Sequence, residues 1–143
     1  MKDLLPYLES RFRLCADVAG RSVVGLSMGG HALDIGLKNT HCVSAIGAFS
    51  AATPRFANKE LLQRYPSLAG TEPSANLLRH LWIPIGSKDF LLDRNESFTN
   101  QLTSLGICHS YVKMSGGHEW RVWRKCFSEY LPMVHPAPRQ TSR

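Results

Sequence analysis

The stretch Ser22-Val-Val-Gly-Leu-Ser-Met-Gly-Gly-His31 decides the fold of this chain. Residues 22–26 form an apolar run of the kind that makes a buried strand, and a helical pattern starts at His31. Between them, residues 25–29 match the pattern G-x-S-x-G, and a strand–turn–helix setting is what a nucleophile elbow requires. We therefore predict that the Ser27 hydroxyl projects above a sheet from a tight turn. The alternative is a glycine-rich turn with a capping serine.

The sequence around this turn also favours chemistry at the serine. Gly25 and Gly29 lack the Cβ atoms that would clash in a strained turn. The helix expected over 31–38 would direct the free N–H groups of its N-terminus at developing negative charge. The turn therefore provides a nucleophile together with a donor for an oxyanion.

Three further apolar segments follow, separated by helical or loop sequence, and this alternation predicts an α/β fold with a parallel sheet. The four expected strands are 22–26, roughly 43–49, 81–85 and 110–114. Pro84 argues against the third strand because proline cannot donate to a ladder. We retain this strand because Gly86-Ser-Lys-Asp89 supplies the turn that should follow it.

The flanking helices are predicted from apolar residues at helical spacing. The opening helix should start at Asp3, its expected N-cap, and its apolar face is Leu4, Leu5, Leu8, Phe12 and Cys15. A later helix should start with a capping box of Asp93 and Glu96 and stop at Gly106. The last helix should bury Trp120, Trp123, Phe127, Tyr130, Leu131 and Val134. Residues 53–78, with three prolines, are expected to form loops and short helices over a site.

Length and charge set the broad class. The chain has 143 residues and carries 17 Lys+Arg against 11 Asp+Glu, a net charge of +6. One domain over 1–135 with a flexible tail over 136–143 is expected for this length. The basic residues are dispersed, so a nucleic-acid-binding domain is only a minor alternative. No apolar run approaches the ~20 residues that span a bilayer, and residues 1–6 are too short and polar for a signal peptide. We expect a cytoplasmic protein without a membrane or nucleic-acid partner.

The four cysteines are widely spaced and form no Cys-x-x-Cys pair. The pairs His41–Cys42 and Cys108–His109 could each offer at most one ligand to a common site, because neighbours on a strand point to opposite faces. We therefore expect reduced thiols, no metal site and no cofactor.

A serine nucleophile needs a base and an orienting acid, and an elbow of this type predicts the order Ser…Asp/Glu…His in loops after later strands. Asp89 follows the third expected strand, and His118 follows the fourth on a glycine turn. Asp93 competes with Asp89 for the acid role, but its expected position at a helix cap explains it without chemistry. Of the six histidines, only His118 stands just beyond a strand and before an amphipathic helix.

Three motifs now carry a family resemblance. Gly25-Leu-Ser-Met-Gly-Gly30, Gly86-Ser-Lys-Asp-Phe-Leu-Leu92 and Gly116-Gly-His-Glu-Trp120 resemble the esterase-D/feruloyl-esterase branch of the α/β-hydrolases. That branch includes tributyrin-esterase-like and S-formylglutathione-hydrolase-like proteins. The resemblance runs from about Asp3 to Leu131 and implies a serine carboxylesterase with a small ester substrate. The few strands and few cap residues of the chain predict a shallow, open site, which favours short-chain acyl esters. It makes Ser27 the nucleophile, Asp89 the acid, His118 the base and the Met28 backbone N–H one oxyanion donor.

The chain departs from that family at its start. A complete domain has further strands before the elbow helix, with a loop that gives the second oxyanion N–H. A truncated α/β-hydrolase fold would leave the strand 22–26 as an apolar edge, and such edges tend to pair with another chain. We expect a homo-oligomer, most simply a two-fold dimer, that covers this edge. The alternative is a catalytically idle hydrolase that acts as an oligomerising or interaction module.

Aromatic residues near the motifs are candidates for substrate binding. Trp82, Phe90 and Trp120 could wall the acyl site, whereas the helical spacing of Trp123 favours core packing. The resemblance leaves simple acyl esters, acetylated or feruloylated sugars and thioesters open as substrates.

Overall fold

The computed structural model describes residues 3–69 and 78–135. The sheet has four parallel strands in sequential order: β1 (Ser22–Leu26), β2 (Ala45–Phe49), β3 (His80–Gly86) and β4 (Ser110–Met114). The predicted α/β fold is confirmed, and the first and last strands have the expected bounds. The tail over 136–143 lies outside the described residues.

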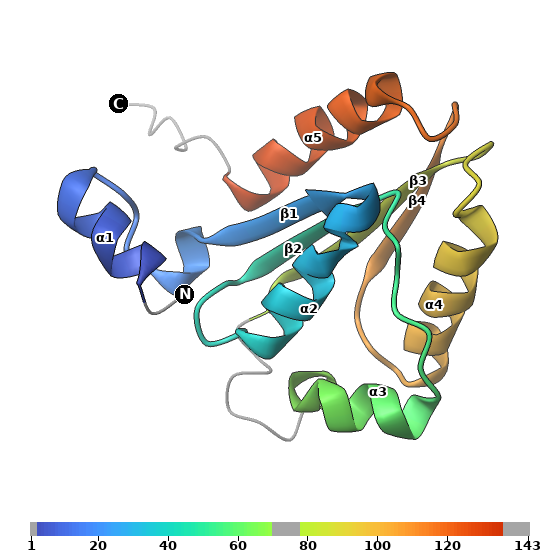
Figure 1. Ribbon diagram of the computed structural model, residues 1–143, viewed down its shortest axis with the longest axis horizontal. Helices are drawn as coiled ribbons and strands as arrows, with labels where there is room; N and C mark the ends of the chain where they lie inside the picture. The colour runs from blue at the N-terminus through green and yellow to red at the C-terminus, as the bar shows by residue number, and fades with distance from the viewer. Residues whose placement is uncertain (1–2, 70–77, 136–143) are drawn as a thin grey trace, which may run out of the picture.

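The strand order decides where the helices lie. Crossovers between adjacent parallel strands are right-handed, so successive crossovers in one direction place their helices on the same face. These helices are α2 (His31–Lys38), α3 (Asn58–Arg64) and α4 (Leu92–Ser104). α5 (Trp120–Val134) follows the last strand and covers the opposite face (Figure 1). The sheet is therefore the middle layer of three.

Each face of the sheet has its own core. Alternate residues of β2 divide between them, with Ile46 facing α2 and Phe49 facing α5. The first core contains Leu33, Leu37, Ile46, Leu61, Leu81, Ile83, Phe98 and Leu102. The second contains Ala45, Phe49, Trp82, Met114, Val122, Cys126, Tyr130 and Val134. Because both faces are buried, β2 and β3 read as continuous apolar runs.

Pro84 lies inside β3, close to the point where the pairing of β3 with β2 ends. The pairing of β2 with β3 ends at Gly47 and Trp82, and the Pro84 carbonyl accepts the N–H of Ser50 beyond that point at 2.8 Å. The strand therefore forms despite the proline, because β3 still pairs with β4 at Pro84 and Val112.

The buried face of α5 differs from the prediction. Its buried residues are Val122, Cys126, Tyr130 and Val134, whereas Trp120, Phe127 and Leu131 are exposed. The cause is Tyr130, which stacks on Trp82 with ring centroids 5.8 Å apart. A Cβ at Gly47 would lie 3.2 Å from the Tyr130 ring, so the glycine gives this ring its place. This contact rotates the tryptophan side of the helix toward the rim.

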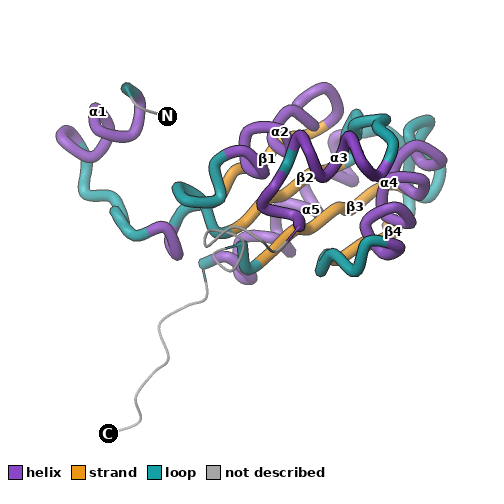
Figure 2. Tube along the Cα trace, turned by 90° about the horizontal axis from the view of Figure 1, so that it is seen from below, coloured by secondary structure: helices purple, strands orange, loops and turns teal. Residues whose placement is uncertain are grey.

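The opening helix forms, but its apolar face does not pack. α1 (Leu4–Arg11) has no buried residue, and Phe12 and Cys15 lie beyond its end. Asp3 holds the N-cap position without a side-chain cap hydrogen bond. Figures 1 and 2 show α1 standing away from the sheet, before β1. η1 (Val18–Gly20) links this part of the chain to β1.

α4 starts earlier than predicted and has no capping box. Leu91 is its N-cap, Asp93 lies in the first turn, and Glu96 pairs with Lys113 on β4. The C-terminal stop at Gly106 is confirmed, with φ of 68°. The N–H groups of Gly106 and Ile107 bond to the carbonyls of Thr103 and Leu102, which is the Schellman arrangement.

The segment after β2 forms loops and short helices as predicted, namely α3 and η3 (Pro66–Ala69). Residues 70–77 of that segment lie outside the described part. Over the described residues, every helix is too short or too polar to cross a bilayer.

Candidate active site

Ser27 occupies a strained turn at the carboxyl end of β1. Its φ is 55°, in the left-handed region that a serine rarely adopts, which costs roughly 1–3 kcal/mol. η2 (Ser27–Gly30) follows at once and leads into α2. A Cβ at Gly25 would lie 1.8 Å from the Gly29 carbonyl oxygen, so only glycine permits the chain to fold back here. The Ser27 carbonyl accepts the N–H of Ala52 at 2.9 Å, which ties the turn to the segment after β2.

His118 lies between Ser27 and Asp89. Its Nε2 is 2.7 Å from the Ser27 Oγ, and its Nδ1 is 2.9 Å from Oδ2 and 3.0 Å from Oδ1 of Asp89. The Asp89 side chain is fully buried and that of His118 is 16% exposed. A carboxylate at Nδ1 fixes the tautomer with the proton on Nδ1, which leaves Nε2 as the acceptor for a hydroxyl proton. The three residues that the sequence singled out thus lie in one line of hydrogen bonds.

Asp89 is held by its own turn as well. Its Oδ1 accepts the N–H of Leu91 at 2.8 Å, and its carbonyl accepts the N–H of Leu92 at 3.0 Å. The sequence analysis considered Asp93 as an alternative acid and predicted that it caps a helix. In the structure, Asp89 makes the hydrogen bonds of the turn that starts α4. Asp93 is exposed in the first turn of α4.

The loops that carry Asp89 and His118 are in direct backbone contact. Ser87 N–H donates to the Met114 carbonyl at 2.7 Å, and Lys88 N–H donates to the Gly116 carbonyl at 2.9 Å. A Cβ at Gly86 would lie 2.6 Å from the Gly116 oxygen. Glycine at this position therefore lets the two loops approach closely.

One family model covers nearly the whole chain. The family model described as "Putative esterase" matches residues 1–134. The chain belongs to this esterase family. Of the solved structures that resemble this esterase-family chain, a ferulic acid esterase is 25% identical, with a TM-score of 0.73 over 92% of this chain and 57% of that one.

Two staphylococcal structures share the fold. An S-formylglutathione hydrolase (FrmB) from Staphylococcus aureus is 17% identical, with a TM-score of 0.74 over 92% of this chain and 57% of that one. The fluorophosphonate-binding serine hydrolase F (FphF) of the same organism is 18% identical, with a TM-score of 0.71 over 93% and 61%. The esterase-family chain therefore spans somewhat more than half the length of these proteins.

Aromatic side chains surround the imidazole of this esterase-family chain. The rings of Phe90 and Trp123 lie 4.4 and 5.0 Å from the His118 ring, centroid to centroid. Phe90 is 77% exposed and Trp120 is 62% exposed, so both stand at the rim. Trp82 is buried between Phe49 and Tyr130, which removes it from the candidate site. Trp123 is half-buried and joins the α5 core to the site.

Met28 is the residue whose backbone N–H the sequence singled out as a candidate oxyanion donor. It follows Ser27 at the start of the η2–α2 run, where the first backbone N–H groups of a helix lack intrahelical acceptors. The Met28 side chain is 80% exposed.

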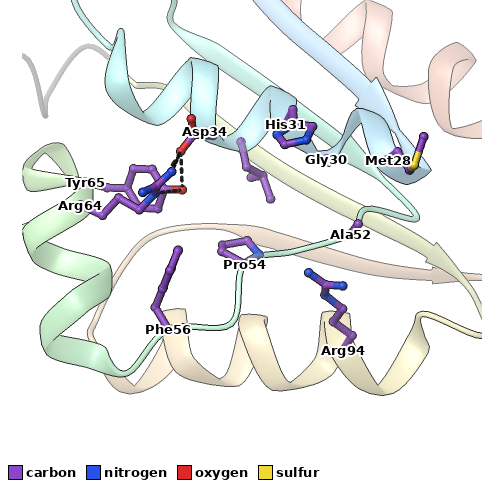
Figure 3. A pocket seen from close by; sticks show the side chains of 11 residues that line it. Met28, Gly30, His31, Asp34, Ala52, Pro54, Phe56, Arg64, Tyr65 and Arg94 are labelled. Atoms are coloured by element: carbon purple, nitrogen blue, oxygen red, sulfur yellow. Dashed lines mark hydrogen bonds and ion pairs between the residues drawn. The ribbon is translucent and has the colours of Figure 1, made fainter.

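A cavity of about 370 Å³ lies beside Met28 (Figure 3). Its lining combines apolar and charged residues from η2, α2, α3, α4 and the segment after β2: Met28, Gly30, His31, Leu33, Asp34, Ala52, Pro54, Phe56, Arg64, Tyr65 and Arg94. The sequence analysis pointed to this cavity only through the expectation that residues 53–78 lie over a site.

Proposed function

We propose that this chain is a serine carboxylesterase that hydrolyses short-chain acyl esters. The observation that supports it best is the hydrogen-bonded line from Asp89 through His118 to the Ser27 Oγ, with distances of 2.9 and 2.7 Å. Membership of the esterase family supports the same reaction class. In this proposal Ser27 is the nucleophile, His118 the general base and Asp89 the orienting acid.

The reaction would proceed through an acyl-enzyme. The Ser27 Oγ attacks the ester carbonyl carbon while His118 Nε2 takes the hydroxyl proton, and Asp89 stabilises the imidazolium that forms. The tetrahedral oxyanion is bound by the Met28 N–H. The carbon–oxygen bond to the alcohol then breaks, and the alcohol takes the proton from Nε2. A water molecule, deprotonated by His118, releases the acid and restores Ser27.

One oxyanion donor is assigned in this mechanism, and we propose that a partner chain supplies the second. Removal of one such donor typically lowers turnover by ~10²–10³-fold. We therefore propose a weak esterase when the chain acts alone. The exposed rings of Phe90 and Trp120 form an open rim rather than a deep tunnel, which favours short acyl groups.

The second candidate function is an interaction module without catalysis. It is favoured by the open edge of β1, which has a neighbour in the sheet on one side only among the described strands. An apolar hollow of about 610 Å³ runs along that edge and is lined in part by Val24, Leu26, Trp123 and Phe127. Exposed apolar edges of this kind are typical of interfaces.

A serine-directed fluorophosphonate separates the two functions. We expect it to label the purified chain on Ser27, as located by mass spectrometry of the labelled peptide, and we expect His118→Ala to abolish the labelling. Ser27→Ala should remove hydrolysis of 4-nitrophenyl butyrate without changing the circular dichroism spectrum. A folded wild-type chain that takes no label would overturn the esterase and leave the interaction module.

A further inference from the structure

The cavity beside Met28 plays no part in the steps above, yet it borders the turn that holds the proposed nucleophile. Met28 is the residue after Ser27, and Ala52 donates its N–H to the Ser27 carbonyl. Both residues line the cavity, so its wall begins at the turn that holds the serine. A group attached to the bound ester could extend from Ser27 into this space.

Arg94 stands in the opposite wall with its head group fixed (Figure 3). Its Nε donates to the Thr53 carbonyl at 2.6 Å, and the Thr53 hydroxyl donates to the Arg94 carbonyl at 3.2 Å. Thr53 is buried and Arg94 is half-buried, so this pair of bonds holds the guanidinium at the cavity. A guanidinium held through Nε keeps its terminal N–H groups for a planar anion.

Arg94 has no carboxylate partner in residues 3–69 and 78–135, where the ion pairs involve other residues. The one acidic residue in the described lining, Asp34, is already neutralised. Its carboxylate accepts from Arg64 Nη2 at 2.9 Å, from the Tyr65 hydroxyl at 2.9 Å and from Lys38 Nζ at 2.8 Å. Burial would raise the pKa of Asp34, but hydrogen bonds from Lys38, Tyr65 and Arg64 outweigh it and lower that pKa.

We infer that this cavity is a subsite for an anionic group of the substrate, with the Arg94 guanidinium as its ligand. The substrate class is an ester whose acyl chain ends in a carboxylate, since the cavity begins at Met28, the residue next to the serine that would carry the acyl group. The inference rests on the proposed esterase function. Arg94 here determines specificity and takes no part in bond breaking.

The test compares two esters whose acyl chains differ only in a terminal carboxylate. One is 4-nitrophenyl hemiglutarate, corrected for its rate in buffer, and the other is 4-nitrophenyl butyrate. We expect the wild-type chain to prefer the hemiglutarate in kcat/KM, and Arg94→Gln to lower that preference by about tenfold or more, because a charge-assisted hydrogen bond is lost. The rate on the butyrate should stay within about twofold, since no step of the ester hydrolysis uses Arg94.

Arg55→Gln is the matched control. Arg55 is exposed and lies outside the lining of this cavity, so the control removes the same charge from a neighbouring surface. We expect it to leave the preference unchanged, and an equal loss in both variants would overturn the subsite in favour of a general effect of net charge. A second pair, 4-carboxyphenyl butyrate and 4-carbamoylphenyl butyrate, places the charge on the alcohol. An Arg94-dependent preference confined to this pair would overturn the acyl assignment.

A binding measurement separates failure of the subsite from failure of the esterase. In the Ser27→Ala variant, calorimetric titration should detect binding of glutarate, and adding Arg94→Gln should weaken that binding by about tenfold or more. Absence of Ser27-dependent turnover on the butyrate would refute the esterase alone. Equal binding of glutarate by both variants would refute the subsite alone. If Arg94→Gln does not fold, Arg94→Lys takes its place, with the salt dependence of the hemiglutarate rate as the readout.

Discussion

Replacement of Asp89 by asparagine tests the proposed mechanism most directly. The carboxylate is fully buried and accepts from both His118 Nδ1 and the Leu91 N–H. Asparagine has the same shape, and its oxygen can retain the Leu91 bond. Its NH₂ group then faces Nδ1 and forces the proton of His118 onto Nε2.

That change removes the general base without moving the ring. Nε2 lies 2.7 Å from the Ser27 Oγ, so a protonated Nε2 would present a donor where the mechanism needs an acceptor. We expect kcat on 4-nitrophenyl acetate to fall by ~10³–10⁴-fold, which corresponds to about 4–5.5 kcal/mol of transition-state stabilisation. The rate of fluorophosphonate labelling should fall with it.

Asp93→Asn is the control for this experiment. Asp93 is exposed in the first turn of α4, so its replacement by asparagine removes the same charge a few residues from Asp89. We expect its kcat to stay within about twofold of wild type, because surface substitutions without a partner have small effects. A loss below tenfold in a folded Asp89→Asn variant, or equal losses in both variants, would refute the role of Asp89.

Three further expectations concern the fold. Gly106→Ala should lower the free energy of unfolding by about 1 kcal/mol without affecting kcat. The cost is conformational, because φ at this position is 68° and nothing lies within 4 Å of an added Cβ. An unchanged urea midpoint would contradict this prediction. Burial raises the pKa of the Cys126 thiol to about 12. Iodoacetamide at pH 8 should therefore modify the exposed Cys15 and Cys108, while Cys126 reacts only after unfolding, and peptide mapping would locate the modified residues. We expect the open edge of β1 to join two copies of the chain. Sedimentation equilibrium at micromolar concentration should then give a mass of twice 16.0 kDa for wild type and 16.0 kDa for a folded Val24→Lys variant. A monomeric wild type would refute the dimer.

The sequence predicted the sheet well because each of its signals is local. The apolar run before Ser27, the glycine after α4 and the turns after β3 and β4 each act within a few residues of the chain. The order of Ser27, Asp89 and His118 along parallel strands then places all three at the same edge of the sheet. Local patterns therefore sufficed to assemble the candidate site.

The errors have a common physical origin in contacts between distant segments. α5 has apolar residues on two of its faces, so periodicity alone could not show that Tyr130, and not Trp120, lies on the sheet. Trp82 lies in β3, a few residues before Asp89 in the sequence, but its side chain packs in the core beneath α5. The bonds between Thr53 and Arg94 join residues 41 positions apart, and no local pattern announces them.

The backbone contact between the loops after β3 and β4 has a mechanical consequence. Because Lys88 bonds to Gly116, the loops of the acid and the base are tied directly to each other, whereas the nucleophile is tied to the segment after β2 through Ala52. Alignment for proton transfer then depends on the junction of β2 and β3, where the Ser50 N–H donates to the Pro84 carbonyl. Thermal opening of that junction would interrupt proton transfer while the pair of Asp89 and His118 remained intact.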